Sequence, residues 1–415
     1  MSKKVPAVLV MLTICTAALV VGIRATSGGT LSSRLSTLTE ILALIEDRHV
    51  PEVESKQLVY SGIRGMLGTL DPHSNFLDEE AFREMREEQR GSFYGLGIVI
   101  SKRGRNQPLR VVSPIANTPA ARLGIRAGDV INHIHDPRAD VDVDTLGLTI
   151  QEAVKYLRGP RGTEVEVTID RPGLEEPIVF EVRRDAVRTP AVNLAFMIRP
   201  EVGFIQMSNF TETTTRELDA ALERLRRQGA ERLVLDLRQN PGGLLKQAIS
   251  VSSRFLDSGQ LVVYTEGRLK GSRQDYESLD DVPSRVDWPL VVILDRGSAS
   301  ASEIVAGAIQ DHDRGIVVGE TSFGKGLVQS VYPLSENAAV ALTTQKYFTP
   351  VGRSIQRPYS SEEEYYYEAQ ARETTMDVPE DAPVFHTETG RVVHGGGGIR
   401  PDVLIPPERD PQILF

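Results

Sequence analysis

The pattern of hydrophobic and polar positions changes twice along the chain and divides it into three parts. Residues 31–68 carry leucine and isoleucine every three or four positions, which predicts amphipathic helices, the second from about 56 to 67, and a short charged helix follows at 78–90. From 91 to 186, short alternating runs bounded by glycine turns predict paired strands. From 187 onward, buried strands alternate with helices, which indicates an α/β core.

The apolar runs of the third part predict individual elements. We expect buried strands at 202–207, 233–237 and 290–294, and helices at 214–227 and 301–310. Residues 358–395 are acidic and rich in tyrosine, with little periodicity, whereas residues 403–405 are expected to return as an edge strand.

The N-terminus has the pattern of an export signal. Lys3 and Lys4 precede an uncharged, mostly apolar run from Val5 to Ile23, which is typical of a secretion signal. Because about 18 apolar residues can span a bilayer, an uncleaved anchor is favoured over a cleaved signal peptide. We therefore expect residues 1–27 to be a signal peptide or membrane anchor, and the remainder to lie in the periplasm or another extracytoplasmic compartment, attached to the inner membrane.

Composition and charge exclude several classes of protein. With 47 Lys and Arg against 57 Asp and Glu, the net charge is −10, which argues against a nucleic-acid partner. Cys15 is the only cysteine, so neither an intramolecular disulfide nor a cysteine-based metal site is possible. His133 and His135 share one face of a predicted strand, but no third ligand is evident nearby. We expect neither a metal nor another cofactor.

A glycine turn in the second part is a candidate peptide-binding loop. Gly95, Leu96 and Gly97 could present successive backbone N–H groups to a carboxylate, and the strand that starts at Ile98 could pair with an extended peptide. The pocket wall would come from a helix that carries Ala153, Val154 and Leu157. Residues 113–131 resemble the middle of a PDZ domain, which implies binding of C-terminal or extended apolar peptides.

A serine-rich segment between a buried strand and a helix contains a candidate nucleophile. It reads Ser298-Ala299-Ser300-Ala301-Ser302-Glu303. A serine at a helix N-terminus meets free N–H groups and the positive end of the helix dipole, which stabilise negative charge. However, Ser300 and Glu303 also have the spacing of a capping box, so this segment alone favours an ordinary helix cap.

Lys325 is the candidate general base. It lies between Gly324 and Gly326 among apolar strands, where burial would lower its pKa toward neutrality. Gln329, four residues further along a predicted strand, would share its face and could orient the amine. A solvated lysine at a strand end is the alternative that this segment leaves open.

Acyl transfer also needs donors for an oxyanion. Candidates are the Gly242-Gly243 turn after a buried strand and the N–H of Ala301.

Taken together, these segments resemble the carboxy-terminal processing proteases, also called tail-specific proteases. The matching stretches run in the family's order: Leu70-Asp71-Pro72-His73-Ser74, the PDZ segment, 235–245, 297–303, 323–326, 352–356 and 398–402. The resemblance implies a Ser300/Lys325 dyad assisted by Gln329, with oxyanion donors at Ala301 and the Gly242-Gly243 turn and a supporting role for Glu303. It also implies a crotonase-like ββα protease core with a PDZ domain ahead of it.

The resulting division is an N-terminal helical region at 28–90, a PDZ domain at 91–186 and a protease core with a C-terminal extension at 187–415. We expect an exported serine endopeptidase that selects proteins by apolar C-terminal tails and forms an acyl-enzyme. Its expected partners are such protein or peptide substrates, a possible activating or adaptor protein, and a second copy bound through the N-terminal helices.

Two other functions stay open at this point. One is a catalytically silent or gated PDZ adaptor that binds C-terminal peptides. The other is a Ser-His-Asp hydrolase that uses His312, flanked by Asp311 and Asp313, although we expect these three to be solvated at a helix end.

Overall fold

The computed structural model describes residues 31–359, 361, 365, 378 and 381–406. The predicted export segment lies outside the described residues, as do positions 360, 362–364, 366–377 and 379–380 of the acidic segment 358–395. Within the described ranges, no helix combines the length and the apolar character needed to cross a membrane.

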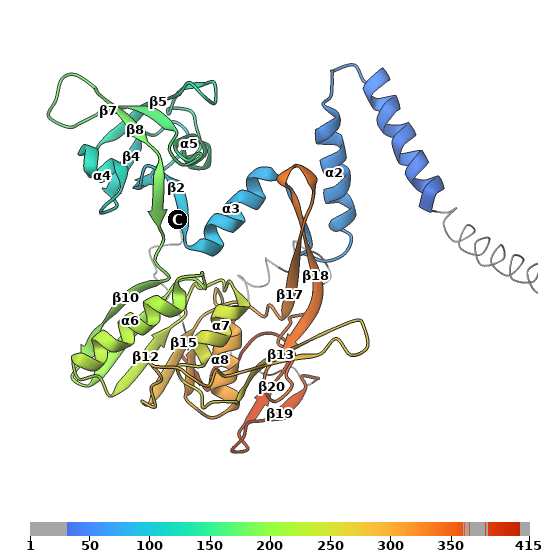
Figure 1. Ribbon diagram of the computed structural model, residues 1–415, viewed down its shortest axis with the longest axis vertical. Coiled ribbons are helices and arrows are strands. Elements are labelled where there is room, and N and C mark those ends of the chain that lie inside the picture. Colours follow the sequence, from blue (N-terminus) through green and yellow to red (C-terminus); the bar gives the residue numbers. More distant parts are fainter. Residues whose placement is uncertain (1–30, 360, 362–364, 366–377, 379–380, 407–415) are drawn as a thin grey trace, which may run out of the picture.

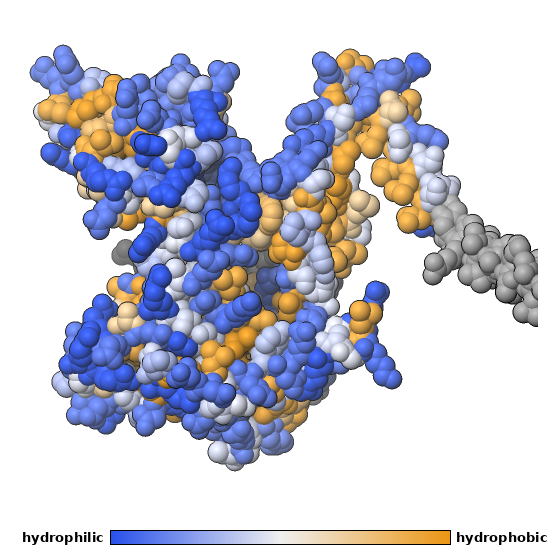
Figure 2. Space-filling view, in the orientation of Figure 1, coloured by the Kyte–Doolittle hydropathy of each residue, from blue (hydrophilic) through white to orange (hydrophobic). Residues whose placement is uncertain are grey.

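An N-terminal arm of two helices leads away from the body (Figure 1). The first helix covers residues 31–48 and the second is α2 (Ser55–Leu67), as the spacing predicted. The apolar stripe of the first helix is exposed: Leu31 and Leu44 keep 64% and 60% of their surface accessible. Figure 2 shows hydrophobic residues gathered along this arm, which therefore presents an apolar face to solvent.

A short connector ties the arm to the body. Strand β1 (Asn75–Leu77) is followed by α3 (Glu79–Arg90), whose N-cap is Asp78: its Oδ1 accepts a hydrogen bond from Ala81 N at 3.0 Å. Strand β1 pairs antiparallel with β18 (Ala339–Phe348). The N-terminal segment thus becomes an integral part of a sheet of the core.

The second part is a strand-rich unit with its own hydrophobic core, in which Ile131, Ile134 and Val167 are fully buried. Its main sheet has the order β3-β4-β5-β7-β8, with β6 beside β5, while β2 pairs with β9. Its elements are β2 (Ser92–Gly95), β3 (Ile98–Ser101), β4 (Leu109–Pro114), α4 (Pro119–Leu123), β5 (Val130–Asp136), β6 (Val141–Asp144), α5 (Ile150–Leu157), β7 (Glu164–Asp170), β8 (Ile178–Arg183) and β9 (Asp185–Arg188).

The third part is built on a six-stranded sheet of order β10-β11-β12-β15-β16-β21. Strand β10 is antiparallel to β11, and the remaining neighbours are parallel, as expected for an α/β core. The strands are β10 (Val192–Arg199), β11 (Val202–Met207), β12 (Arg232–Asp236), β15 (Leu290–Leu294), β16 (Ile316–Gly319) and β21 (Val403–Leu404). The helices are α6 (Thr214–Arg227), α7 (Leu245–Ser252) and α8 (Ala301–Asp311).

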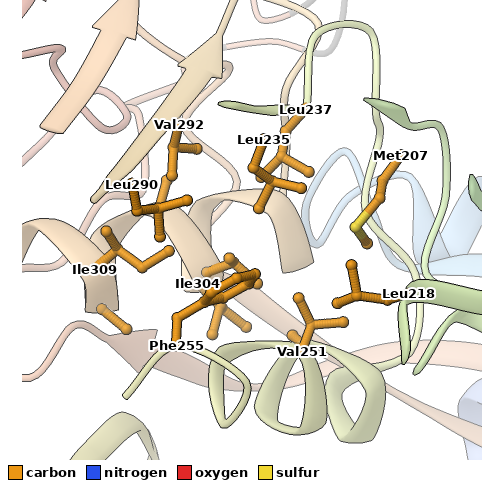
Figure 3. Close-up of a cluster of buried hydrophobic side chains, with 14 of the residues drawn as sticks. Met207, Leu218, Leu235, Leu237, Val251, Phe255, Leu290, Val292, Ile304 and Ile309 are labelled. Carbon is orange, nitrogen blue, oxygen red and sulfur yellow. The ribbon is translucent and has the colours of Figure 1, made fainter. Parts of the chain in front are cut away.

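Helix α8 lies inside the third part, and every residue from Ala301 to Asp311 is buried (Figure 1). It contacts β16 of the first sheet and β13 (Leu261–Gly267) of a second sheet. Figure 3 shows how Ile304 and Ile309 pack with leucine and valine side chains from β12, β15 and α7. A helix buried on all sides gives the residue before it, Ser300, a fixed position.

The second sheet has the order β1-β18-β13-β14, with β17 (Leu327–Pro333) also paired to β18. The remaining elements are β14 (Gln274–Glu277), the 3-10 turn Ser335–Asn337, β19 (Val384–His386) and β20 (Val392–His394). The periodicity did not predict β10, β13 or β14. Strands β10 and β14 leave many side chains exposed, so their apolar pattern is weak. In β13 the buried positions include the adjacent Val262 and Val263, which do not alternate as in a half-buried strand.

Candidate active site

A pocket of about 420 Å³ opens where α8, β17 and the turn before β1 come together. Its apolar lining includes Leu244, Ile304, Leu327 and Val331. Its polar lining includes His73, Ser300 and Gln329, together with Asn75, Gln89 and Tyr347. It therefore combines a hydroxyl, an amide and an imidazole in an apolar cavity, which is the form of many binding and catalytic sites.

Three serines compete for the role of nucleophile, and the structure separates them. Ser298 Oγ donates to Leu237 O at 2.8 Å and Ser302 Oγ donates to Asn240 O at 2.9 Å, so both hydroxyls are buried and paired. Ser300 alone of the three lines the pocket. Its backbone, at φ 55° and ψ −111°, lies in a region that costs a non-glycine residue roughly 1–3 kcal/mol.

Glu303 links the start of α8 to the Lys325 segment. One of its carboxylate oxygens accepts from the backbone N of Ser300 at 2.7 Å and of Lys325 at 2.9 Å. The other accepts from Gly324 N at 2.7 Å and from the hydroxyl of Ser322. Burial raises the pKa of this fully buried carboxyl, while the four donors favour its charged form. A single side chain thus fixes the two predicted catalytic segments relative to each other.

Lys325 is half-buried rather than solvated, as the base hypothesis required. Burial lowers the pKa of its ammonium, and the charges of Glu303 and Asp71 partly oppose that shift. The net direction is downward, which increases the fraction of neutral amine at neutral pH. The lysine backbone is held as well, because the Tyr347 hydroxyl donates to Lys325 O and to Ser300 O.

Gln329 lies on β17 and lines the same pocket as Ser300. Its Nε2 is buried and has no hydrogen-bond partner among the described residues. A buried amide donor without a partner is costly, so a group that binds in this pocket would gain by accepting from it.

The glycine turn predicted to bind an oxyanion packs directly against Ser300. A Cβ on Gly242 would lie 2.8 Å from both Ser300 Cβ and Ala301 N, and Gly242 has φ +100°. Gly242 N donates to Asn240 Oδ1 at 2.9 Å. In the described part of the chain, the N–H groups of Gly243 and Ala301 have no acceptor, so these two remain available for an oxyanion.

The predicted solvation of His312 and its neighbours is wrong. His312 keeps only 7% of its side chain exposed, with Nε2 at 2.7 Å from Leu261 O and Nδ1 at 2.6 Å from Glu388. Asp311 is fully buried and paired with Arg353, and Asp313 is paired with Arg391. These partners lie far away in sequence, so the local charge pattern could not reveal them. None of these three residues lines the Ser300 pocket.

His133 is bonded to carboxylates rather than set up as a metal ligand. Its ring nitrogens lie 2.7 Å and 2.9 Å from the side chains of Asp142 and Asp144. Across the described residues, no cluster of three or more possible ligands has the geometry for a metal ion.

The predicted peptide-binding loop lines a small pocket of its own. Gly95, Leu96, Gly97 and Ile98 surround about 80 Å³ together with Val154, Leu157 and Arg158. Strand β3, which starts at Ile98, pairs with β4 on one side and is an edge of its sheet. An open edge beside an apolar pocket is the arrangement that adds an extended peptide as a further strand.

The comparison with protein families agrees with both regions. The model of peptidase family S41 matches residues 201–361 and that of the PDZ domain matches residues 110–171. These matches define an S41 serine peptidase core with a PDZ domain ahead of it, as the sequence predicted.

Named relatives cover most of the chain. A carboxy-terminal-processing protease from Bartonella bacilliformis is 40% identical over 328 residues, which are 78% of this chain and 73% of that protein. A carboxyl-terminal-processing protease from Synechocystis sp. is 35% identical over 76% of this chain and 72% of that protein. A solved photosystem II D1 C-terminal processing protease is 29% identical, covering 88% of this chain and 85% of that chain with a TM-score of 0.46.

The chain therefore belongs to the carboxy-terminal processing proteases of peptidase family S41 and is a serine peptidase.

Proposed function

We propose that this peptidase cleaves proteins by a Ser300/Lys325 dyad assisted by Gln329. The observation that carries the proposal is the double role of Glu303, whose carboxylate binds the backbone N–H groups of both Ser300 and Lys325. Support also comes from the lowered pKa of Lys325, since a general base must be neutral to accept a proton.

The reaction proceeds through an acyl-enzyme. Ser300 Oγ attacks the scissile carbonyl carbon while the Lys325 amine takes the hydroxyl proton. The N–H groups of Gly243 and Ala301 stabilise the oxyanion, with Gly242 shaping the turn that presents them. As the C–N bond breaks, the Lys325 ammonium returns the proton to the leaving amine. Water then attacks the ester carbonyl while the Lys325 amine takes a proton from it. As the bond from the acyl carbon to Ser300 Oγ breaks, the ammonium gives that proton to Oγ, which regenerates Ser300 and neutral Lys325.

Substrate selection is assigned to the PDZ domain. A PDZ domain binds peptides, and here the open edge of β3 would pair with the end of a substrate while Gly95, Leu96 and Gly97 hold its carboxylate. The pocket walls at Ile98, Val154 and Leu157 are apolar, which favours apolar tails over acidic ones. The proposed substrates are therefore proteins with apolar C-termini.

We also propose that the enzyme acts outside the cytoplasm, with residues 1–27 as leader or anchor. Homo-oligomerisation through the N-terminal helices is proposed because the apolar face of the arm is exposed. The proposed domain limits are 28–90 for the N-terminal helical region, 91–186 for the PDZ domain and 187–415 for the protease core with its C-terminal extension. An activating protein is a further proposed partner.

The test uses the full-length protein with an unfolded substrate that ends in an apolar tail or in Asp-Asp. Ser300→Ala and Lys325→Ala are expected to abolish cleavage. Matched controls are Ser302→Ala, which removes a paired serine hydroxyl, and Lys346→Ala, which removes an exposed lysine; both should stay active. Cleavage by Ser300→Ala or Lys325→Ala would refute the dyad, and equal cleavage of both tails would refute the tail selection.

A further inference from the structure

The turn at Leu70–Ser74 matches the family's sequence, and the dyad leaves its role open. Its His73 lines the pocket of Ser300 and Gln329. The turn is contributed by the N-terminal segment, before the PDZ domain, so it reaches the pocket only through the fold. Its contacts carry an inference that rests on the proposed dyad and goes beyond it.

Asp71 fastens this turn to itself and to β18. Its Oδ1 accepts from the backbone N of His73 at 2.9 Å and of Ser74 at 2.8 Å, and also from Thr343 Oγ1 at 3.0 Å. Its Oδ2 accepts from Ser74 Oγ at 2.6 Å, and Thr343 N donates to that same hydroxyl oxygen at 3.1 Å. In the sheet, Thr343 stands opposite Gln329. The turn is thus tied to the strand beside the amide that shares the pocket.

The other side of His73 is covered by Tyr365. The tyrosine is fully buried, and its hydroxyl lies 3.3 Å from His73 Nε2, with the rings edge to face at 5.2 Å. The same hydroxyl approaches Gly324 O at 3.4 Å, the carbonyl of the peptide bond that leads into Lys325. His73 therefore lies between the pocket and a residue packed on the Lys325 turn.

We propose that His73 is a positioning residue of the active site, which closes the wall beside Lys325 against water and is held there by Asp71. Both residues act through Lys325, and neither takes the proton of the Ser300 hydroxyl.

The electrostatics agree with this geometry. Burial and the charge of Lys325 lower the pKa of His73 to about 4, so the imidazole is neutral in the working range. The charge of Asp71 acts on Lys325 in the opposite sense, because it raises the pKa of the ammonium. The titratable and charged groups that surround Lys325 are Glu303 of α8, Tyr347 of β18, Asp71 and His73 of the turn, and Tyr365 with the adjacent Arg357.

The two residues should therefore move the pH profile in opposite directions. His73→Ala admits water, so the pKa of Lys325 rises. The acidic limb of the pH profile of kcat/KM then moves to higher pH by about half a pH unit or more, and kcat falls about tenfold. Asp71→Asn keeps an acceptor for the His73 and Ser74 N–H groups but removes the charge, so the limb shifts downward by about half a unit. KM should change little in both variants. His73→Gln introduces a neutral side chain of similar length, so the acidic limb of its kcat/KM profile should lie at the wild-type pH.

The experiment measures kcat and KM of the full-length protein from about pH 5 to about pH 10, a range that includes the lowered pKa of Lys325. His133→Ala is the matched control, since it removes a histidine with two carboxylate partners from the PDZ domain and should leave the limb in place. If the single variants Ser300→Ala and Lys325→Ala are inactive but His73→Ala leaves the acidic limb of the pH profile in place, this inference is overturned while the dyad stands. Loss of cleavage in His73→Ala with an active Lys325→Ala would make the imidazole the base and overturn the dyad as well.

Discussion

Two helices of this protein begin with the same sequence pattern, and the two starts have different roles. In the PDZ domain, α5 begins with Thr149 and Glu152, which exchange the two hydrogen bonds of a capping box at an exposed site. In the core, α8 begins with Ser300 and Glu303, and there the glutamate is fully buried and binds a segment more than twenty residues away. The spacing predicts the helix start in both cases, but only burial and distant partners separate the ordinary cap at Glu152 from the supporting role that we propose for Glu303.

The strongest test of this difference is Glu303→Gln. The carboxylate of Glu303 accepts four hydrogen bonds, and the amide nitrogen of the variant would face two of those four donors. The Ser300 and Lys325 segments would then no longer be held together by one side chain. We expect kcat to fall about 100-fold because a displacement of about 1 Å between reacting groups has that effect. Unfolding free energy should fall by about 2 kcal/mol for the unpaired buried donors. Steady-state kinetics and thermal unfolding measure both, and an unchanged kcat would contradict the anchor.

The PDZ region can be tested independently at Gly97. This residue has φ +80°, and a Cβ there would lie 2.2 Å from Thr118 Cβ, so Gly97→Ala must displace the loop that we propose to hold the substrate carboxylate. We expect about a tenfold loss of preference for an apolar over an acidic tail, with kcat for a short peptide retained. Gly162→Ala is the control, because Gly162 also has φ +80° but its Cβ would meet nothing closer than 3.5 Å. Equal losses in both variants would indicate strain rather than a damaged groove.

The fold was predictable where the signal is local. The helix at 214–227 and the strands at 202–207 and 290–294 appear with the expected bounds, because the apolar positions that define each element lie within it. The position of His73 was not predictable, since it depends on contacts with β18 between residues 269 positions apart. Ser300 was chosen among three serines by resemblance, and only packing shows that Ser298 and Ser302 are paired to the backbone.

Histidines of the two regions should also differ in the sign of their effect on stability. His73 has its pKa lowered to about 4 from 6.5, so between these values the unfolded chain binds more protons and stability rises with pH. His133 has its pKa raised by its bonds to Asp144 and Asp142, so it stabilises the fold at acid pH and that contribution is lost as pH rises past its folded pKa.

Replacing each histidine by glutamine isolates these contributions. His73→Gln should flatten the rise between pH 4 and 6.5 by about 1–2 kcal/mol, a figure reduced for partial exposure to solvent. His133→Gln should instead lower stability only on the acid side. Urea unfolding at a series of pH values gives both curves, and the same sign for the two variants would contradict the opposite environments.

The smallest effect is expected at the cap of α5. Glu152→Gln keeps an oxygen that can accept from Thr149 N and loses only the charge at an exposed helix start, where the pKa of Glu152 is lowered mainly by that backbone bond. We expect no measurable loss of unfolding free energy, because the lost charge is screened by solvent at this exposed site, and kcat and tail preference should be unchanged. This change has the same chemistry as Glu303→Gln at the same position of a capping box, so the ratio of the two effects measures what burial and the Lys325 segment add to the pattern. Comparable losses of activity in the two variants would mean that the two helix starts do not differ in role.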